Sequence, residues 1–259
     1  MKLAYREFGE GQPLIILHGL FGQSDNWNTL AKNFGEKGFH VFTPDQRNHG
    51  LSPHSDVWTY EAMADDLKEF IDDHRLKDPV ILGHSMGGKT VMFFEIKYSG
   101  IANKLVIADM SARGYEPHHT DVLKALHAVD FNAIKTRKEA EAMMNTYITD
   151  FGTKQFLLKN IYWKENATGG EEQMDWRFNL KVISDNYDNV SIAVPQYSSP
   201  VKTLVVRGEK SNYIMPTDIE EFRQRFPNAE FVTIAGAGHW VHAEKPKEFF
   251  EVVLDFITG

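Results

Sequence analysis

Ser85 is the residue of this chain whose setting most clearly predicts chemistry. It stands at the centre of a Gly-x-Ser-x-Gly pattern at residues 83–87, between an apolar run at 79–82 and a helix-like run at 88–95. A serine on a sharp strand-to-helix turn is exposed above the end of a sheet, and glycines flank it because a Cβ would clash where two backbones pass closely. The stretch therefore predicts a nucleophile elbow, and a serine nucleophile needs a base within hydrogen-bond reach.

His239 is the expected base. It ends the stretch Gly236-Ala237-Gly238-His239, which follows the last predicted strand and places an imidazole at the edge of the sheet. An imidazole, whose unperturbed pKa is ~6.5, can accept the serine proton and return it to a leaving group. His242 is the nearest rival, but it lies beyond the glycine-rich turn and is expected to start the final helix. His239 and His242 have no third ligand at a metalloprotease spacing, so we predict no metal site.

The elements that must position these residues alternate between strand and helix. Buried apolar runs indicate strands at 3–8, 13–19, 38–45, 79–82, 104–109, 201–208 and 231–234, and helical spacing covers 27–34, 60–71, 88–95, 217–226 and 246–257. This rhythm predicts an α/β fold with a mostly parallel sheet covered by helices on both faces.

The alternation of strands and helices is interrupted between residues 111 and 197. Amphipathic helical runs are expected there at 122–131, 138–147, 154–162 and 176–187, with no buried strand. We therefore predict a core domain made of residues 1–110 and 198–259, with a helical cap of residues 111–197 inserted after strand 6.

Composition excludes several classes of function. The 259 residues carry a net charge of −8, which disfavours nucleic acid or an anionic membrane surface as the main partner. There is no cysteine, so disulfides, thiolate metal sites and cysteine nucleophiles are excluded. The first residues carry charges, and no run approaches the ~20 apolar residues of a membrane span, so a cytoplasmic location is expected.

With these residues in hand, the chain resembles the α/β-hydrolases, and more narrowly the YbfF-type esterases and their mitochondrial abhydrolase-domain relatives. The resemblance implies ester or thioester hydrolysis of a small-molecule acyl substrate without a cofactor, by a monomer or a homodimer. The stretches that carry it run through the whole chain: 18–22, 47–53, 83–89, 155–159, 176–179 and 236–242.

The resemblance also directs the choice of the triad acid. In many relatives an aspartate follows the strand that is 204–207 here, but this chain has Ser211 or Asn212 in that place. Some family members carry the acid at the end of an earlier strand, where this chain has Asp109. A carboxylate there can fix the tautomer of the histidine and stabilise its charged form. Asp109 is therefore the predicted acid, with Glu209, another residue or a Ser–His dyad as alternatives.

The oxyanion hole of this fold uses two backbone N–H groups. We expect them from Met86 and Leu20, with Phe21 as the second choice for the latter, and we expect Phe21 and Trp240 to contact substrate. Residues 47–50 are expected to brace loops near the site, although Asp45 or Arg47 could touch substrate. Aromatic and methionine side chains of the cap favour an acyl chain over a charged metabolite.

The prediction is a serine esterase or thioesterase that forms an acyl-enzyme on short to medium acyl esters. Alternatives with the same triad are a lactonase, a C–C hydrolase and a perhydrolase. A non-catalytic ligand-binding protein on this fold is the alternative from another class.

Overall fold

A seven-stranded sheet forms the centre of the computed structural model, which describes residues 1–117, 119–164 and 173–259. The strand order is β1-β3-β2-β4-β5-β8-β9; β1 pairs antiparallel with β3, and every other pair in this sheet is parallel. The predicted α/β class and mostly parallel sheet are thus confirmed. The strands are β1 (Tyr5–Phe8), β2 (Gln12–Leu17), β3 (Phe39–Pro44), β4 (Val80–His84), β5 (Lys104–Ala108), β8 (Lys202–Gly208) and β9 (Ala229–Ile234).

Helices cover both faces of the sheet because its central strands send successive apolar side chains to opposite sides. Leu14 and Ile16 of β2 belong to one buried cluster, which includes residues of α1 and α11, whereas Ile15 and Leu17 belong to the other, with α2 and α3. This two-sided burial explains why the strands read as continuous apolar runs. The helices of the sheet region are the 3-10 turn η1 (Ser24–Trp27), α1 (Asn28–Gly35), α2 (Tyr60–Asp73), α3 (Met86–Lys97), α9 (Asp218–Arg225), α10 (Val241–Glu244) and α11 (Pro246–Thr258).

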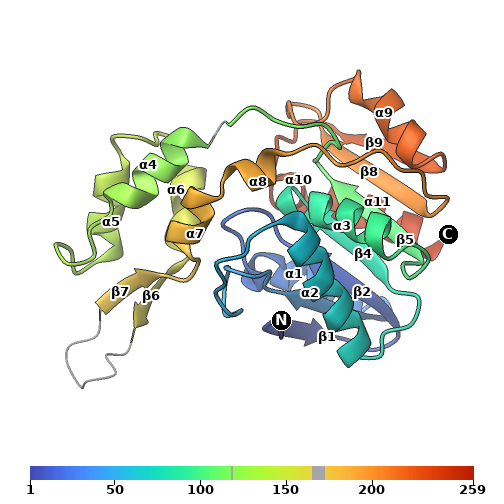
Figure 1. Cartoon of the computed structure of the whole chain (residues 1–259), viewed down its shortest axis with the longest axis horizontal. Coiled ribbons are helices and arrows are strands. Elements are labelled where there is room, and N and C mark those ends of the chain that lie inside the picture. Colours follow the sequence, from blue (N-terminus) through green and yellow to red (C-terminus); the bar gives the residue numbers. More distant parts are fainter. Residues whose placement is uncertain (118, 165–172) are drawn as a thin grey trace.

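The chain leaves the sheet after β5 and returns at β8. Of the elements between them, α4 to α7 with β6 and β7 lie together at one side of the sheet, and α8 lies on the path back to it (Figure 1). We call this stretch the β5–β8 segment. Its two ends are joined by backbone hydrogen bonds, from Val194 N–H to the Ala112 carbonyl and from Tyr115 N–H to the Ser191 carbonyl, both 2.8 Å. Its elements are α4 (Thr120–Ala128), α5 (Arg137–Met144), α6 (Phe151–Leu158), β6 (Ile161–Lys164), β7 (Gln173–Trp176), α7 (Leu180–Asp185) and α8 (Asp188–Ser191).

Three expectations for this segment are wrong. It follows the fifth strand of the chain rather than a sixth, and it is not purely helical, because β6 and β7 form an antiparallel pair with Ile161 opposite Trp176. The aromatic and β-branched residues at 161–163 favour a strand, and α6 ends before them. The predicted helix at 176–187 begins only at Leu180, where the Asn179 side chain caps the Val182 N–H. In the described ranges, no helix has the length and apolar character required to span a membrane.

Candidate active site

Ser85 occupies a strained turn between β4 and α3. Its backbone has φ 54° and ψ −119°, a conformation that costs a residue with a side chain ~1–3 kcal/mol. A Cβ on Gly83 would lie 2.2 Å from the Gly87 carbonyl oxygen, and a Cβ on Gly87 would lie 2.5 Å from the carbonyl oxygen of Leu17. Both contacts are impossible, so the steric reason given above for the two flanking glycines is confirmed.

Three side chains from distant parts of the chain meet at this turn. His239, on the loop after β9, places Nε2 3.0 Å from Ser85 Oγ and Nδ1 2.7 Å from Asp109 Oδ2. The carboxylate only accepts, so Nδ1 carries the hydrogen and Nε2 is the acceptor for the serine hydroxyl. The arrangement can remove the hydroxyl proton and hold the resulting imidazolium.

Asp109 sits directly after β5, fully buried and with a positive φ of 49°. Its Oδ1 accepts a hydrogen bond from Gly208 N–H at 3.0 Å, and its Oδ2 accepts one from the Ser211 hydroxyl. Burial raises the pKa of the Asp109 carboxyl, while the bonds from Ser211 and Gly208 to its charged form oppose the rise. Ser211, at the position where the family resemblance leads us to look for an acid, therefore hydrogen bonds to the carboxylate that contacts His239.

Glu209, the alternative acid, and His242, the alternative base, make other contacts. Glu209 Oε2 accepts a hydrogen bond from Gly236 N–H at 2.7 Å, which braces the loop leading to His239. His242 is buried and stacks on Trp27 with ring centroids 4.1 Å apart, and burial holds the pKa of its imidazole well below the usual value. No group of three or more His, Cys, Asp or Glu side chains in the described part of the chain could hold a metal ion.

Two residues that sequence reasoning missed position His239. The ring of Tyr213 stacks on its imidazole at 3.7 Å between centroids and an angle of 13°. His84, which precedes Ser85, donates from Nε2 to the His239 carbonyl oxygen at 2.9 Å, and burial lowers the pKa of His84 to about 3. The position of His84 inside the elbow pattern was a usable signal, whereas nothing local in the sequence marks Tyr213.

The expected oxyanion-hole residues lie beside Ser85. Met86 is the first residue of α3, so its N–H belongs to the helix-terminal donors that have no acceptor within the helix. A Cβ on Gly19 would lie 3.1 Å from Ser85 Cβ, which shows how closely the backbone before Leu20 approaches the serine. Leu20, Met86 and Ser85 line one small cavity. The donor roles themselves stay a prediction.

A pocket of about 460 Å³ opens above Ser85 and His239, a size that suits a small organic ligand. Phe21 and Trp240, both expected to contact substrate, line it, and so does Phe156 of α6, whose ring lies 5.5 Å from that of Trp240. The β5–β8 segment thus supplies part of the wall.

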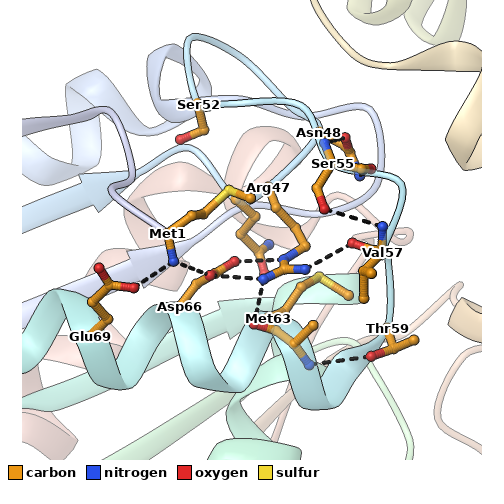
Figure 2. A network of polar contacts seen from close by, with 12 residues as sticks. Met1, Arg47, Asn48, Ser52, Ser55, Val57, Thr59, Met63, Asp66 and Glu69 are labelled. Carbon is orange, nitrogen blue, oxygen red and sulfur yellow. Dashed lines mark hydrogen bonds and ion pairs between the residues drawn. The ribbon is translucent and has the colours of Figure 1, made fainter.

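The loop after β3 is braced in the way expected for residues 47–50. Figure 2 shows the Arg47 guanidinium against Asp66 of α2, with Nε 2.6 Å and Nη2 2.9 Å from the carboxylate oxygens, and Nη1 donating to the Val57 carbonyl. Asp45 accepts from the backbone N–H groups of Ser24 and Leu51. Neither Asp45 nor Arg47 lines the pocket among the residues that the structure describes.

The same loop also reaches the β5–β8 segment. The Asn48 carbonyl accepts from Asn179 N–H at 2.9 Å, and the two side-chain amides are hydrogen bonded at 3.3 Å. The segment is therefore also tied to the sheet region at a point other than its two joined ends.

Comparison with known proteins agrees with this geometry. The sequence profile of the alpha/beta hydrolase fold matches residues 12–246. The chain is 36% identical over 254 residues to the sn-1-specific diacylglycerol lipase ABHD11 of Mus musculus, covering 95% of this chain and 80% of that protein. It is 35% identical over 249 residues to esterase YbfF of Escherichia coli, covering 95% and 93%.

A solved structure, a marine microorganism esterase, superposes with a TM-score of 0.93 at 42% identity and covers 98% of this chain and 99% of its own. These matches confirm the resemblance stated from the sequence. The profile covers most of the chain and the relatives align over nearly all of it, so this protein belongs to the alpha/beta hydrolase fold family.

Proposed function

We propose that the chain is a serine carboxylester hydrolase in which Ser85 is the nucleophile, His239 the base and Asp109 the acid. Its relatives named as esterases and lipases support the activity. The observation that carries the residue roles is the unbroken hydrogen-bond path from Asp109 Oδ2 through the His239 ring to Ser85 Oγ.

The reaction follows from these contacts. Ser85 Oγ attacks the acyl carbon while its proton passes to His239 Nε2, and the charge that develops on the carbonyl oxygen is stabilised by the N–H groups of Leu20 and Met86. The bond to the leaving oxygen breaks, and that oxygen takes the proton from Nε2. Water then attacks the acyl-enzyme, gives a proton to Nε2, and releases the carboxylic acid as Ser85 regains its proton.

The pocket above the serine supports a small apolar ester as substrate, with Phe21 and Trp240 as contacts. We further propose that residues 1–110 and 198–259 act as the catalytic core and residues 111–197 as a cap that shapes the pocket. Whether a thioester replaces the oxygen ester is decided by comparing matched esters and thioesters of one acyl group.

Fluorophosphonate labelling together with p-nitrophenyl ester hydrolysis tests the proposal. We expect wild type to be labelled and to show a product burst, and Ser85→Ala to lose the label and nearly all turnover. Equal labelling of wild type and Ser85→Ala would refute Ser85 as nucleophile. A panel of lactones, peracid-forming conditions and C–C substrates would identify the alternative activities.

The cytoplasmic location and the monomeric or homodimeric state stay predictions. Cell fractionation and light scattering of the purified protein test them.

A further inference from the structure

Two cavities of different size meet at Ser85. The larger is the pocket of about 460 Å³, and the smaller, about 20 Å³, has room for one water molecule or a methyl-sized group. Leu20, Ser85 and His119 line both cavities, so the reacting carbon would lie where the two join. The smaller cavity is further walled by the side chains of Tyr60, Tyr115, Tyr187, Tyr213, Met110 and Val190.

The tyrosine hydroxyls of the small cavity are engaged elsewhere. Tyr60 donates to the Val190 carbonyl at 2.9 Å, Tyr115 donates to the Tyr213 carbonyl at 2.7 Å, and the Tyr187 hydroxyl bonds to His119 Nδ1. Burial raises the pKa of Tyr60 and of Tyr115 above the usual value, so both stay neutral phenols. The Tyr213 hydroxyl lies 3.4 Å from His119 Nε2. Among the described residues the lining is mostly aromatic rings with Met110 and Val190, next to the polar His119 and Ser191, and it includes no Lys, Arg, Asp or Glu, so it suits a small apolar group better than a charged one.

Proton transfer decides which half of an ester enters which cavity. The leaving oxygen must receive its proton from His239 Nε2, so the alcohol half has to lie on the side of the imidazole. His239 lines the larger pocket and, among the described residues, is not part of the wall of the smaller one. The acyl half is left with the smaller cavity, next to Leu20 and Met86.

We propose that the tyrosine-lined cavity is the acyl subsite and limits this enzyme to acyl groups of two or three carbons, while the larger pocket receives the alcohol. The inference rests on the proposed function and narrows its substrate class. It reverses the expectation that the aromatic cleft under the cap holds the acyl chain, and it makes Met110 and Val190 determinants of acyl length. Any longer chain must displace packed rings, and overpacking of this kind is costly.

Two ester series separate the cavities. In the first, p-nitrophenol stays fixed and the acyl group runs from acetyl to octanoyl; in the second, acetyl stays fixed and the alcohol runs from ethyl to hexyl and naphthyl. We expect kcat/KM to fall ~10-fold or more between propionyl and hexanoyl, since a single methylene can decide discrimination of that order. Across the alcohols kcat/KM should hold or rise.

Matched variants assign the effect to the cavities. Val190→Ala and Met110→Ala should each raise the hexanoyl-to-acetyl ratio of kcat/KM several-fold. Phe156→Ala, which enlarges only the larger pocket, should leave that ratio as in wild type and change the dependence on the alcohol. The proposal stays testable even if one of these three variants misfolds, because the dependence of wild-type kcat/KM on acyl length tests it directly.

A wild-type kcat/KM that climbs steadily to octanoyl, with the acyl ratio altered by Phe156→Ala, would place the acyl chain in the larger pocket and overturn the proposal. Absence of both labelling and ester cleavage would instead overturn the proposed function, and the subsite with it.

Discussion

Replacing Asp109 by asparagine gives the sharpest test of the triad, because the surroundings dictate how the amide must lie. Gly208 N–H donates to Oδ1 at 3.0 Å, so the amide oxygen of asparagine is retained there. The NH2 group then takes the place of Oδ2, where it faces Ser211 Oγ and His239 Nδ1. The hydroxyl can accept from it, so the variant keeps its local hydrogen bonds and is expected to fold.

The imidazole, however, must now accept at Nδ1, which moves its hydrogen to Nε2. In that tautomer Nε2 donates toward Ser85 Oγ, which lies 3.0 Å away in the unmodified protein, and cannot take its proton. Loss of the correct tautomer in a triad costs ~10⁴ in kcat, which corresponds to ~5.5 kcal/mol of activation free energy. We expect Asp109→Asn to lose turnover on that scale with little change in melting temperature.

Glu209→Gln is the matched control. Its carboxylate accepts from Gly236 N–H at 2.7 Å, a bond that an amide oxygen can also accept, so kcat/KM should stay within ~3-fold of wild type. Both variants are assayed with p-nitrophenyl acetate and by thermal melting. An Asp109→Asn enzyme with a tenth of the wild-type turnover, or a crippled Glu209→Gln enzyme, would refute the assignment of the acid.

Three further predictions follow from other contacts. Ser211→Ala removes a hydrogen bond to the Asp109 carboxylate worth ~1.5–3 kcal/mol. We expect kcat/KM to fall ~10-fold or more, and a variant with wild-type kcat/KM would contradict the role of this hydroxyl. Burial lowers the pKa of His18 to about 4 and that of His49 to about 3. Between these values and the unperturbed pKa of ~6.5, the unfolded chain binds more protons than the folded chain. The free energy of unfolding should therefore fall as the pH falls through this range. At pH 5 each of these histidines should lower the free energy of unfolding by ~2 kcal/mol relative to pH 7. Equal midpoints of urea denaturation at pH 7 and pH 5 would contradict this prediction. Finally, if the alcohol half occupies the larger pocket, added hexanol should capture the acetyl-enzyme and yield hexyl acetate, detectable by gas chromatography, and hydrolysis unaffected by hexanol would argue that the alcohol binds elsewhere.

The parts of the site that are local in sequence could be predicted directly. The turn around Ser85 shows itself because strand, glycines and helix occur within a few residues, and the steric need for glycine is a backbone property. Asp109 follows from the family resemblance and from the lack of a carboxylate at positions 211 and 212. Its actual support, the Ser211 hydroxyl and the Gly208 N–H, joins residues about a hundred positions apart, which no local pattern encodes.

The missed strand pair β6–β7 and the missed contact of Tyr213 both depend on residues that are distant in the sequence. The helical spacing of the preceding residues leads the predicted helix to run on through Ile161, although the aromatic and β-branched residues there favour the strand that pairs with Gln173–Trp176. The stacking of Tyr213 on His239 depends on how the loop after β8 meets the loop after β9. In each case the deciding contact joins residues that are distant in the sequence, which no local pattern shows.

The joined ends of the β5–β8 segment have a consequence for how new specificities arise. Val194 is hydrogen bonded to Ala112 and Tyr115 to Ser191, so the two ends of the segment are held close together beside the sheet, like the ends of a short loop. The entropy of closing a loop grows only slowly with its length, so insertions between the joined ends should cost the sheet little loop entropy, provided that contacts such as that of Asn179 with Asn48 are kept. Tyr115 and Val190 near this base also wall the small cavity. A chimaera that takes residues 111–197 from a relative should therefore take part of its acyl limit from that relative, through Tyr115 and Val190, and keep Met110 and its proton-transfer residues from the donor of the sheet.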